Sequence, residues 1–354
     1  MGSTRGEPEG LSVLPCPGWP ERLASGPELA ETARAAMDEA CTMAGVRRNP
    51  LAWVALGGAG ADYVIARGTA RIGAADGRVL PGDYERAAAA ALAGEDRRNL
   101  IHAFAVSSTL DGTHSLEEPH GLIGSRLETN VLCVAPKHGF LTGTIPALAH
   151  AGFRTAGFVL ATISAACVLT PAEMEIGALL LDLGGTHSSL AVFARGRPRH
   201  LASVRFGGLQ VTRDLAVALG VPLARAEEIK LRGLLDRAMY ERVVLARWRE
   251  IFIMLRAAFV QGWPGRLAGG CVLTGGAAST RDLPELARDI LGMPVRVGVA
   301  ACGRTQETLA GPAFAATLGL LSAGERRLIW GDILHAPKEA VPWRLRLPRH
   351  SSPA

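Results

Sequence analysis

The sequence predicts an α/β protein of two to three domains, and three observations support that prediction. The chain has 354 residues, whereas single hydrophobic cores stop growing at about 250–300 residues. Its composition is 48% hydrophobic and 20% charged, which favours large buried cores over disorder. Strand-like apolar runs alternate with helical stretches through the second half of the chain, a pattern typical of α/β folds.

The N-terminal part changes from an irregular segment to helix and strand patterns. Residues 1–25 are rich in Gly, Pro and Glu and have no periodicity, which favours disorder. The Ala-rich stretch Glu28–Gly45 predicts a helix that ends at its glycine. The apolar run Leu51–Leu56, followed by Gly57 and Gly58, predicts a short strand and a turn.

A small α+β module is predicted next. Tyr84–Ala93 is Ala-rich and predicts a helix, while Leu100–Val106 and Leu127–Ala135 have the apolar patterns of strands. A helix is then expected at Leu141–Ala151. The uncharged stretch Thr155–Thr170 is shorter than the roughly 20 apolar residues that span a bilayer, so it predicts a buried strand and helix.

The second half has a cleaner alternation of strands and helices. Three strands joined by tight turns are predicted at Ala178–Leu183, Ser189–Arg195 and His200–Arg205, and a helix at Val211–Leu219. A long amphipathic helix is expected over Tyr240–Gln261 because apolar side chains recur there at helical spacing. The last predicted elements are the strands Cys271–Thr274 and Val295–Val297 and the helix Leu283–Leu291.

Composition argues against nucleic-acid binding, against a zinc or disulfide framework and against secretion. The net charge of +5 comes from basic residues that are scattered along the chain, and the three Tyr and nine Phe do not alternate with them, so no nucleic-acid partner is expected. The six cysteines form no close pair, which suggests neither a zinc cluster nor a disulfide framework. Since residues 1–20 also lack a signal-peptide pattern, a cytoplasmic location is expected.

The first candidate binding segment follows the strand at Ala178–Leu183. Asp182 stands at the end of this apolar run, and Gly184, Gly185 and Thr186 follow it in a tight turn. Glycines let backbone N–H groups approach phosphate oxygens, and an aspartate can hold a magnesium ion through water. A plain hairpin turn between two buried strands is the alternative interpretation of this segment taken alone.

Further segments downstream favour a nucleotide site. Glu227 and Lys230 lie three residues apart on one helical face, where they could bind ribose hydroxyls or form an ordinary surface ion pair. Two more glycine turns occur downstream. The first precedes a predicted helix, and the second follows a predicted strand and offers backbone on which an adenine could lie. These turns contain Gly207 and Gly208, and Gly275, Gly276 and Ala277.

In this order and spacing the segments resemble a known family. Asp182–Ser188, Phe206–Asp214, Ala226–Lys230 and Val272–Ala278 are similar to the nucleotide-binding segments of the actin and Hsp70 superfamily and, within it, of the bacterial cell-division family FtsA. The resemblance covers about residues 30–322. It implies an actin-like ATPase fold of two α/β halves with a small inserted α+β subdomain of the SHS2 type.

The resemblance also implies a division of the chain into segments. It assigns 1–25 to a disordered segment, 26–50, 136–176 and 299–322 to the first half, 51–135 to the inserted SHS2 subdomain, 177–222 and 263–298 to the second half, 223–262 to a shortened outer subdomain, and 323–354 to a C-terminal tail.

The sequence departs from the family pattern at several positions. No Asp-x-Gly follows a strand in the first fifty residues, so the first phosphate loop is expected to be missing through truncation. Thr186 replaces a glycine and His187 a threonine of the second loop, which predicts weaker phosphate binding. Leu209 and Gln210 replace the usual aspartate and histidine. The short segment after Lys230 predicts a reduced docking surface for FtsZ.

The resemblance implies a scaffold that links FtsZ filaments and divisome proteins at the cytoplasmic face of the inner membrane at the division site. Self-association, weak binding of ATP with magnesium at Asp182, and vestigial catalysis are expected. The family's membrane helix has a short candidate at Arg326–Leu334, whereas Trp343–Leu347 lies between prolines, so membrane contact stays open. Alternatives are an actin-like pilus-assembly or partition scaffold and a sugar-kinase-like enzyme, although no catalytic base or first phosphate loop is located.

Overall fold

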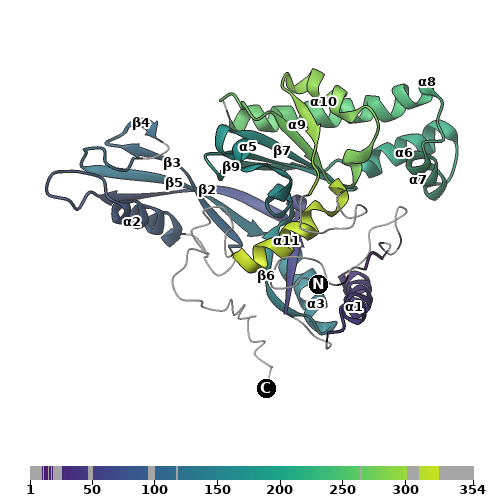
Figure 1. The fold of residues 1–354 in the computed structure, drawn as a ribbon, viewed down its shortest axis with the longest axis horizontal. Coiled ribbons are helices and arrows are strands. Elements are labelled where there is room, and N and C mark those ends of the chain that lie inside the picture. Colours follow the sequence, from purple (N-terminus) through teal and green to yellow (C-terminus); the bar gives the residue numbers. More distant parts are fainter. Residues whose placement is uncertain are drawn as a thin grey trace.

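The computed structural model describes residues 26–46, 51–94, 100–116, 119–263, 265–300 and 311–326, together with residues 10, 12–14, 16 and 18. Most of the expected disordered segment, the candidate membrane helix beyond Arg326 and most of the expected C-terminal tail lie outside the described residues. The described chain forms three sheets with helices packed around them (Figure 1). The predicted α/β architecture, two halves with a small inserted module, is confirmed.

The second half is built on a five-stranded sheet. Its strands, in spatial order, are β11 (Val295–Val297), β10 (Cys271–Thr274), β7 (Ala178–Leu183), β8 (Ser188–Ala194) and β9 (Arg197–Val204). The central strand β7 pairs parallel with β10 and antiparallel with β8. All five strands were predicted from the sequence, with boundaries that differ by at most three residues.

Strand β7 has a buried core on each of its two faces. Leu179, Leu181 and Leu183 pack into the core of the second half, whereas Ala178 and Leu180 belong to a core shared with the first half. Side chains of a strand alternate between its two faces, and strands covered on both faces are apolar throughout. The uninterrupted apolar run in the sequence reflects this double burial.

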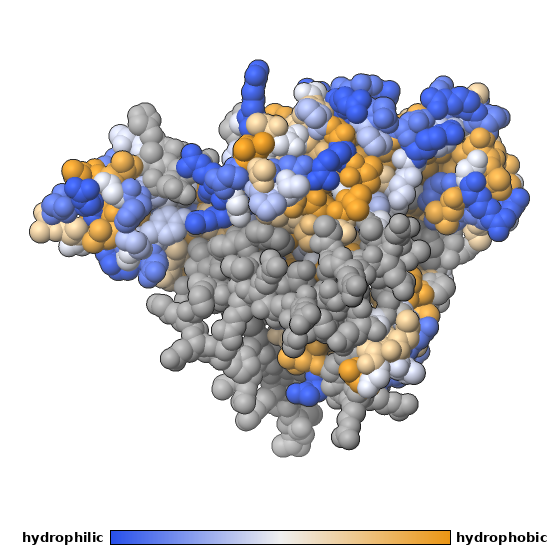
Figure 2. All heavy atoms as spheres, viewed as in Figure 1, coloured by the Kyte–Doolittle hydropathy of each residue, from blue (hydrophilic) through white to orange (hydrophobic). Residues whose placement is uncertain are grey.

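The helices of the second half cover its sheet. They are α6 (Gly208–Leu219), α7 (Leu223–Arg232), α8 (Arg237–Met239), the π-helical segment Tyr240–Leu245, α9 (Ala246–Gly262) and α10 (Leu283–Leu291). The predicted long helix is confirmed, and its helically spaced Trp248, Phe252 and Leu255 are fully buried. Figure 2 shows hydrophilic residues gathered over α8 and α10, the outer side of this half.

The first half has a smaller sheet of two parallel strands, β1 (Leu51–Leu56) and β6 (Arg154–Leu160). The strand β1 falls within the range 51–135 expected for the inserted module, yet it pairs with β6, outside that range. Helices surround this sheet: α1 (Gly26–Met43), a π-helical turn at Phe140–Thr144 leading into α3 (Ile145–His150), α4 (Ala161–Ser164) with a 3₁₀ turn at Ala165–Val168, and α11 (Ala315–Arg326).

The inserted module is a four-stranded antiparallel sheet in the order β2-β5-β3-β4. Its elements are β2 (Ala61–Arg71), α2 (Pro81–Ala91), β3 (His102–Leu110), β4 (Thr113–Leu116) and β5 (Arg126–Pro136). The sequence did not predict β2. Helix α2 packs closely on β2 at Gly68, where an added Cβ would lie 2.0 Å from the Ala91 nitrogen.

Polar side chains hold the module against both halves. Arg199 on β9 is 6% exposed, and its Nη1 donates a 2.9 Å hydrogen bond to the Val106 carbonyl on β3. The fully buried His102 on β3 accepts a hydrogen bond of 3.0 Å at Nε2 from the Leu160 nitrogen at the end of β6. Buried polar groups need such partners, so these contacts fix where the module sits.

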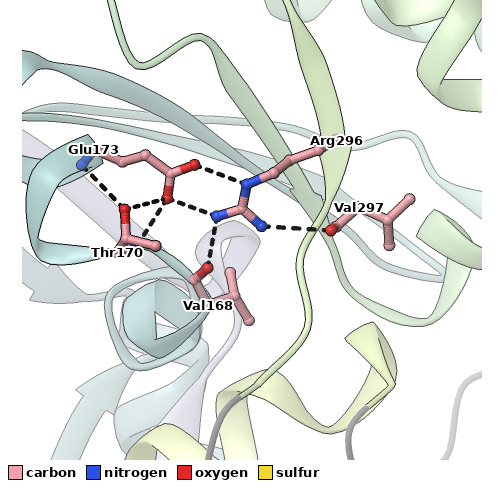
Figure 3. Close-up of polar contacts among 5 residues, drawn as sticks. All are labelled: Val168, Thr170, Glu173, Arg296 and Val297. Atoms are coloured by element: carbon pink, nitrogen blue, oxygen red, sulfur yellow. Dashed lines mark hydrogen bonds and ion pairs between the residues drawn. The ribbon is translucent and has the colours of Figure 1, made fainter.

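An ion pair joins the halves where the chain crosses between them. Helix α5 (Pro171–Ile176) leads from the first half into β7, and its Glu173 closes a capping box with Thr170. Arg296 on β11 donates to both Glu173 carboxylate oxygens, from Nε at 2.7 Å and from Nη2 at 2.6 Å (Figure 3). Its Nη2 also donates to the Val168 carbonyl at 2.9 Å. The Arg296 hydrogen bonds lower the pKa of Glu173.

Candidate functional site

A cavity of about 540 Å³ lies in the second half, and six of the sequence-predicted site residues line it. They are Gly185, Gly208, Glu227, Lys230, Gly276 and Ala277. The cavity is also lined by Tyr240 of the π-helical segment, by Trp248 near the start of α9 and by Arg281 in the turn before α10. A volume of this size is typical of sites that bind small organic ligands.

Lys230 and Glu227 on α7 form a nearly buried ion pair, with side chains 16% and 13% exposed and an Nζ to Oε2 distance of 2.7 Å. Lys230 Nζ also donates to the Thr212 hydroxyl at 2.7 Å and to the Gly208 carbonyl at 3.1 Å. Thr212 Oγ1 donates to the Glu227 carboxylate. Burial lowers the pKa of Lys230. The network ties α7 to the start of α6, so its polar groups are held in place before any ligand binds.

The turns at Gly184–Gly185 and Gly207–Gly208 lie directly against each other. The Gly208 and Leu209 nitrogens donate to the Gly184 and Gly185 carbonyls at 3.0 and 2.8 Å. An added Cβ at Gly207 would lie 2.4 Å from the Gly184 oxygen, which is closer than real Cβ contacts. Glycine is therefore required at Gly207 by this close approach, and the pairing fixes one edge of the cavity.

Asp182 is the last residue but one of β7 and lies beside the third glycine turn. An added Cβ at Gly275, whose φ is +86°, would lie 2.5 Å from Asp182 Oδ1. Burial raises the pKa of Asp182 to about 6, and no hydrogen bond to its carboxylate is found among the described residues. Asp182 is partly buried, and a carboxylate that loses hydration with no cation or donor beside it is costly to ionise. A bound divalent cation would supply the missing positive charge.

His187 follows Thr186 at the end of the turn that contains Gly184 and Gly185. Its ring lies against the first half at Gly57, where an added Cβ would meet Cε1 at 2.7 Å and Nε2 at 2.8 Å. The Thr186 hydroxyl is 3.1 Å from His187 Nδ1, which fixes the orientation of the ring. Burial lowers the pKa of His187, so the imidazole is neutral around pH 7.

The remaining predicted residues are not among those that line the cavity. Asp182, Gly184, Thr186, Gly207 and Gly275 belong to the same turns without lining the cavity. Sequence reasoning missed Thr212, Tyr240 and Arg281. Arg281 stacks 4.7 Å above the Tyr240 ring, and Tyr240 donates its hydroxyl hydrogen to the Arg281 carbonyl. Thr212 was within a quoted motif, whereas Tyr240 and Arg281 are distant in sequence and had no pattern of their own.

Comparison with known proteins identifies the family. The model of the family "Cell division protein FtsA" matches residues 179–319, and that of the SHS2 domain inserted in FtsA matches residues 60–135. The Pseudomonas aeruginosa cell division protein FtsA is 32% identical over 320 residues, which cover 82% of this chain and 76% of that protein. The chain belongs to the FtsA family of cell-division proteins. The FtsA of Neisseria meningitidis serogroup B is 28% identical, with 70% of this chain and 67% of the relative covered.

A solved structure confirms the fold of this FtsA-family chain. The PilM–PilN type IV pilus biogenesis complex has a chain that superimposes with a TM-score of 0.65 at 18% identity, and the match covers 90% of this chain and 92% of the other. The inserted module corresponds to the SHS2 match at residues 60–135, which begins one residue before β2. The strand β1 thus lies outside both the matched SHS2 segment and the module's sheet.

No helix in the described part of the chain is long and apolar enough to cross a membrane. Nor do three or more His, Cys, Asp or Glu side chains there form a cluster that could hold a metal ion. Magnesium is usually held by one or two carboxylates, water and substrate phosphates, so Asp182 fits a cation that arrives together with a nucleotide.

Proposed function

We propose that this chain is an FtsA-type scaffold that links FtsZ filaments and divisome proteins at the cytoplasmic face of the division site and binds ATP with magnesium weakly. The observation that supports nucleotide binding is the cavity in which Lys230, Glu227 and the glycine turns converge. Family membership supports the role in division. Self-association and peripheral membrane contact belong to the same proposal.

Each wall of the cavity has groups that suit one part of the nucleotide. The Glu227 carboxylate can accept bonds from ribose hydroxyls, because only its Oε2 is used in the bonds to Thr212 and Lys230. The three donors of the Lys230 ammonium already bond to Glu227, Thr212 and Gly208, so Lys230 would bond to a ribose oxygen by exchanging one of these partners. Backbone at Gly276 and Ala277 can face the adenine. Gly185 and Gly208 offer a backbone surface without side chains on the phosphate side.

Magnesium would be held at Asp182 with the ligand phosphates, where it would neutralise negative charge on both. Catalysis is proposed to be vestigial, because phosphoryl transfer depends on groups that position the terminal phosphate and the attacking water. Thr186 and His187 stand where the family pattern has a glycine and a threonine. The role proposed here is therefore binding and assembly.

Substitution of Lys230 tests the nucleotide site. Lys230→Met removes the ammonium from the cavity wall while keeping a long side chain, so affinity for adenine nucleotides should fall at least about tenfold, about 1.4 kcal/mol. Isothermal titration with magnesium present measures this. The matched control is Arg225→Met on the same helix, at an exposed position, which should bind as the wild type does. Equal affinity of Lys230→Met and wild type would contradict the site.

The division role is tested in cells and by sedimentation. A fluorescent fusion should form a midcell band in dividing cells, and the purified protein should pellet with FtsZ filaments. A diffuse signal together with no co-sedimentation would overturn the scaffold proposal. Localisation with pilus-assembly proteins would favour the pilus-type alternative.

A further inference from the structure

The cavity is lined by the second half alone. Every residue that lines it falls between Gly185 and Arg281, and none of the described residues of the first half contributes to its wall. A ligand that fills the cavity is therefore held by α6, α7 and the glycine turn after β10. Groups from the first half meet the second half at the far end of the turn that contains Gly185, at His187 and Ser189.

At that end the two halves are in direct contact. The connection from β1 to β2 presses its backbone against the start of β8: an added Cβ at Gly58 would lie 2.2 Å from Ser189 Oγ, just as one at Gly57 would overlap the His187 ring. Contacts under 3.0 Å are not seen for real Cβ atoms. No space for a further group remains between these backbone atoms and the two side chains.

Hydrogen bonds hold this connection in place. The Gly58 carbonyl accepts bonds of 3.2 Å from both the Tyr63 hydroxyl on β2 and the Ser203 hydroxyl on β9. Burial raises the pKa of Tyr63 to about 12, so its hydroxyl keeps its proton and remains a donor. The connection is thus bonded to the module and to the second half at once, and it cannot move away without breaking both bonds.

Gly185 lines the cavity, and the chain continues from it through Thr186 to His187. A phosphate chain that followed this turn out of the cavity would therefore meet these two side chains. The imidazole is neutral, so it gives no charge attraction to a phosphate. Steric exclusion of a competing ligand is an established route to specificity. A nucleotide with a short phosphate chain stays within the cavity, whereas a longer chain must displace the His187 ring from its contact with Gly57.

We propose that the site selects adenine nucleotides that lack a γ-phosphate, and that His187 is the residue that sets this preference by filling the space of the terminal phosphate. The inference rests on the proposed nucleotide binding and specifies its ligand as the nucleoside diphosphate. ATP then binds weakly because the last phosphate has no place.

Titration of ADP and ATP, each with magnesium, tests the preference. The wild type should bind ADP at least about tenfold more tightly than ATP. His187→Gly opens the space and should tighten ATP until the two affinities agree within about threefold, with little change for ADP. His187→Ser is the second variant, in case the glycine loosens the turn. The exposed His138→Ala is the matched control and should keep the wild-type ratio.

The outcomes separate this inference from the proposed function. Wild-type affinity for ATP equal to or above that for ADP would overturn the preference while leaving nucleotide binding intact. An unchanged ratio in folded His187→Gly and His187→Ser would remove His187 from its role. Binding of neither nucleotide by a wild type with a cooperative thermal transition would overturn the proposed function and, with it, this inference.

Discussion

Strand β7 of the second half has a strand on each side and a buried core on each face, whereas β1 of the first half has one neighbour among the described residues, β6. The cavity and its ion pair belong to the more extensive second half. The first half contributes backbone contacts at Gly57 and Gly58 instead. The residues that line the cavity therefore belong to the second half, and the backbone that packs against His187 and Ser189 belongs to the first half. Each set can be altered by substitutions in one half alone.

Core substitutions give the largest test of this difference. Phe252→Ala in α9 removes a fully buried ring and should lower the free energy of unfolding by about 3–5 kcal/mol. Phe158→Ala on β6, where the ring is 6% exposed, should cost about 1 kcal/mol less because its smaller sheet can relax around the cavity. Urea unfolding measures both.

Ile253→Ala is the control for the helix itself, because that side chain is 53% exposed, and it should change stability by less than about 0.5 kcal/mol. If Phe158→Ala costs as much as Phe252→Ala or more, the two halves are equally well packed and the comparison fails.

The partly buried Asp182 carboxylate of the second half predicts an effect of pH on stability that is intermediate in size. The pKa of Asp182 is raised from 3.8 to about 6, so the folded protein binds a proton more tightly than the unfolded chain. This contribution to stability is fully present below pH 4 and is lost as the pH rises through 6. Asp182→Asn should therefore be more stable than wild type at pH 7.5 by about 3 kcal/mol, with little difference at pH 4.

Urea unfolding from pH 4 to pH 8 measures this difference, with the exposed Asp289→Asn on α10 as control. A wild-type curve parallel to that of Asp182→Asn across this range would show that the carboxylate already has a compensating partner. Magnesium and ADP should reduce the difference at pH 7.5, because ligand binding stabilises the folded state of the wild type.

The ion pair between Arg296 and Glu173, which joins the two halves, predicts the smallest effect on stability. Arg296→Gln removes the charge that holds Glu173, but Arg296 is 40% exposed, so solvent screening limits the loss to about 1 kcal/mol. The exposed pair Arg225–Glu228 is the control, and Arg225→Gln should change stability by less than about 0.5 kcal/mol. Thermal unfolding compares the two, and equal effects would mean that the Arg296–Glu173 pair is no better than a surface pair.

The sequence predicted the second half more completely than the inserted module. The spacing of Trp248 and Phe252 and the apolar run of β7 follow from burial, which leaves a regular pattern. Strand β2 left none, because Asp62, Arg67 and Gly68 interrupt its apolar residues and several of its side chains face solvent.

The candidate site could likewise be predicted from the sequence only where its residues form a local pattern. Glycine turns and the Glu227–Lys230 spacing are local patterns, so they were found in the sequence. The contact of His187 with Gly57 and the placing of Tyr240 beside Arg281 depend on segments that only folding brings together. Contacts between segments that are distant in the sequence leave no local pattern from which they could be predicted.

The buried Arg199 has a consequence for how this protein can be divided. Its guanidinium is always charged and donates to a carbonyl of the inserted module. Excision of residues 61–136, even with a well-designed loop in their place, would remove the Val106 acceptor of Arg199 Nη1 at the edge strand β9 and keep the bond from its Nε to the Ala194 carbonyl. The inserted module contacts both halves of the protein. A variant that lacks it would therefore test the stability of the fold before it could test the binding of partners.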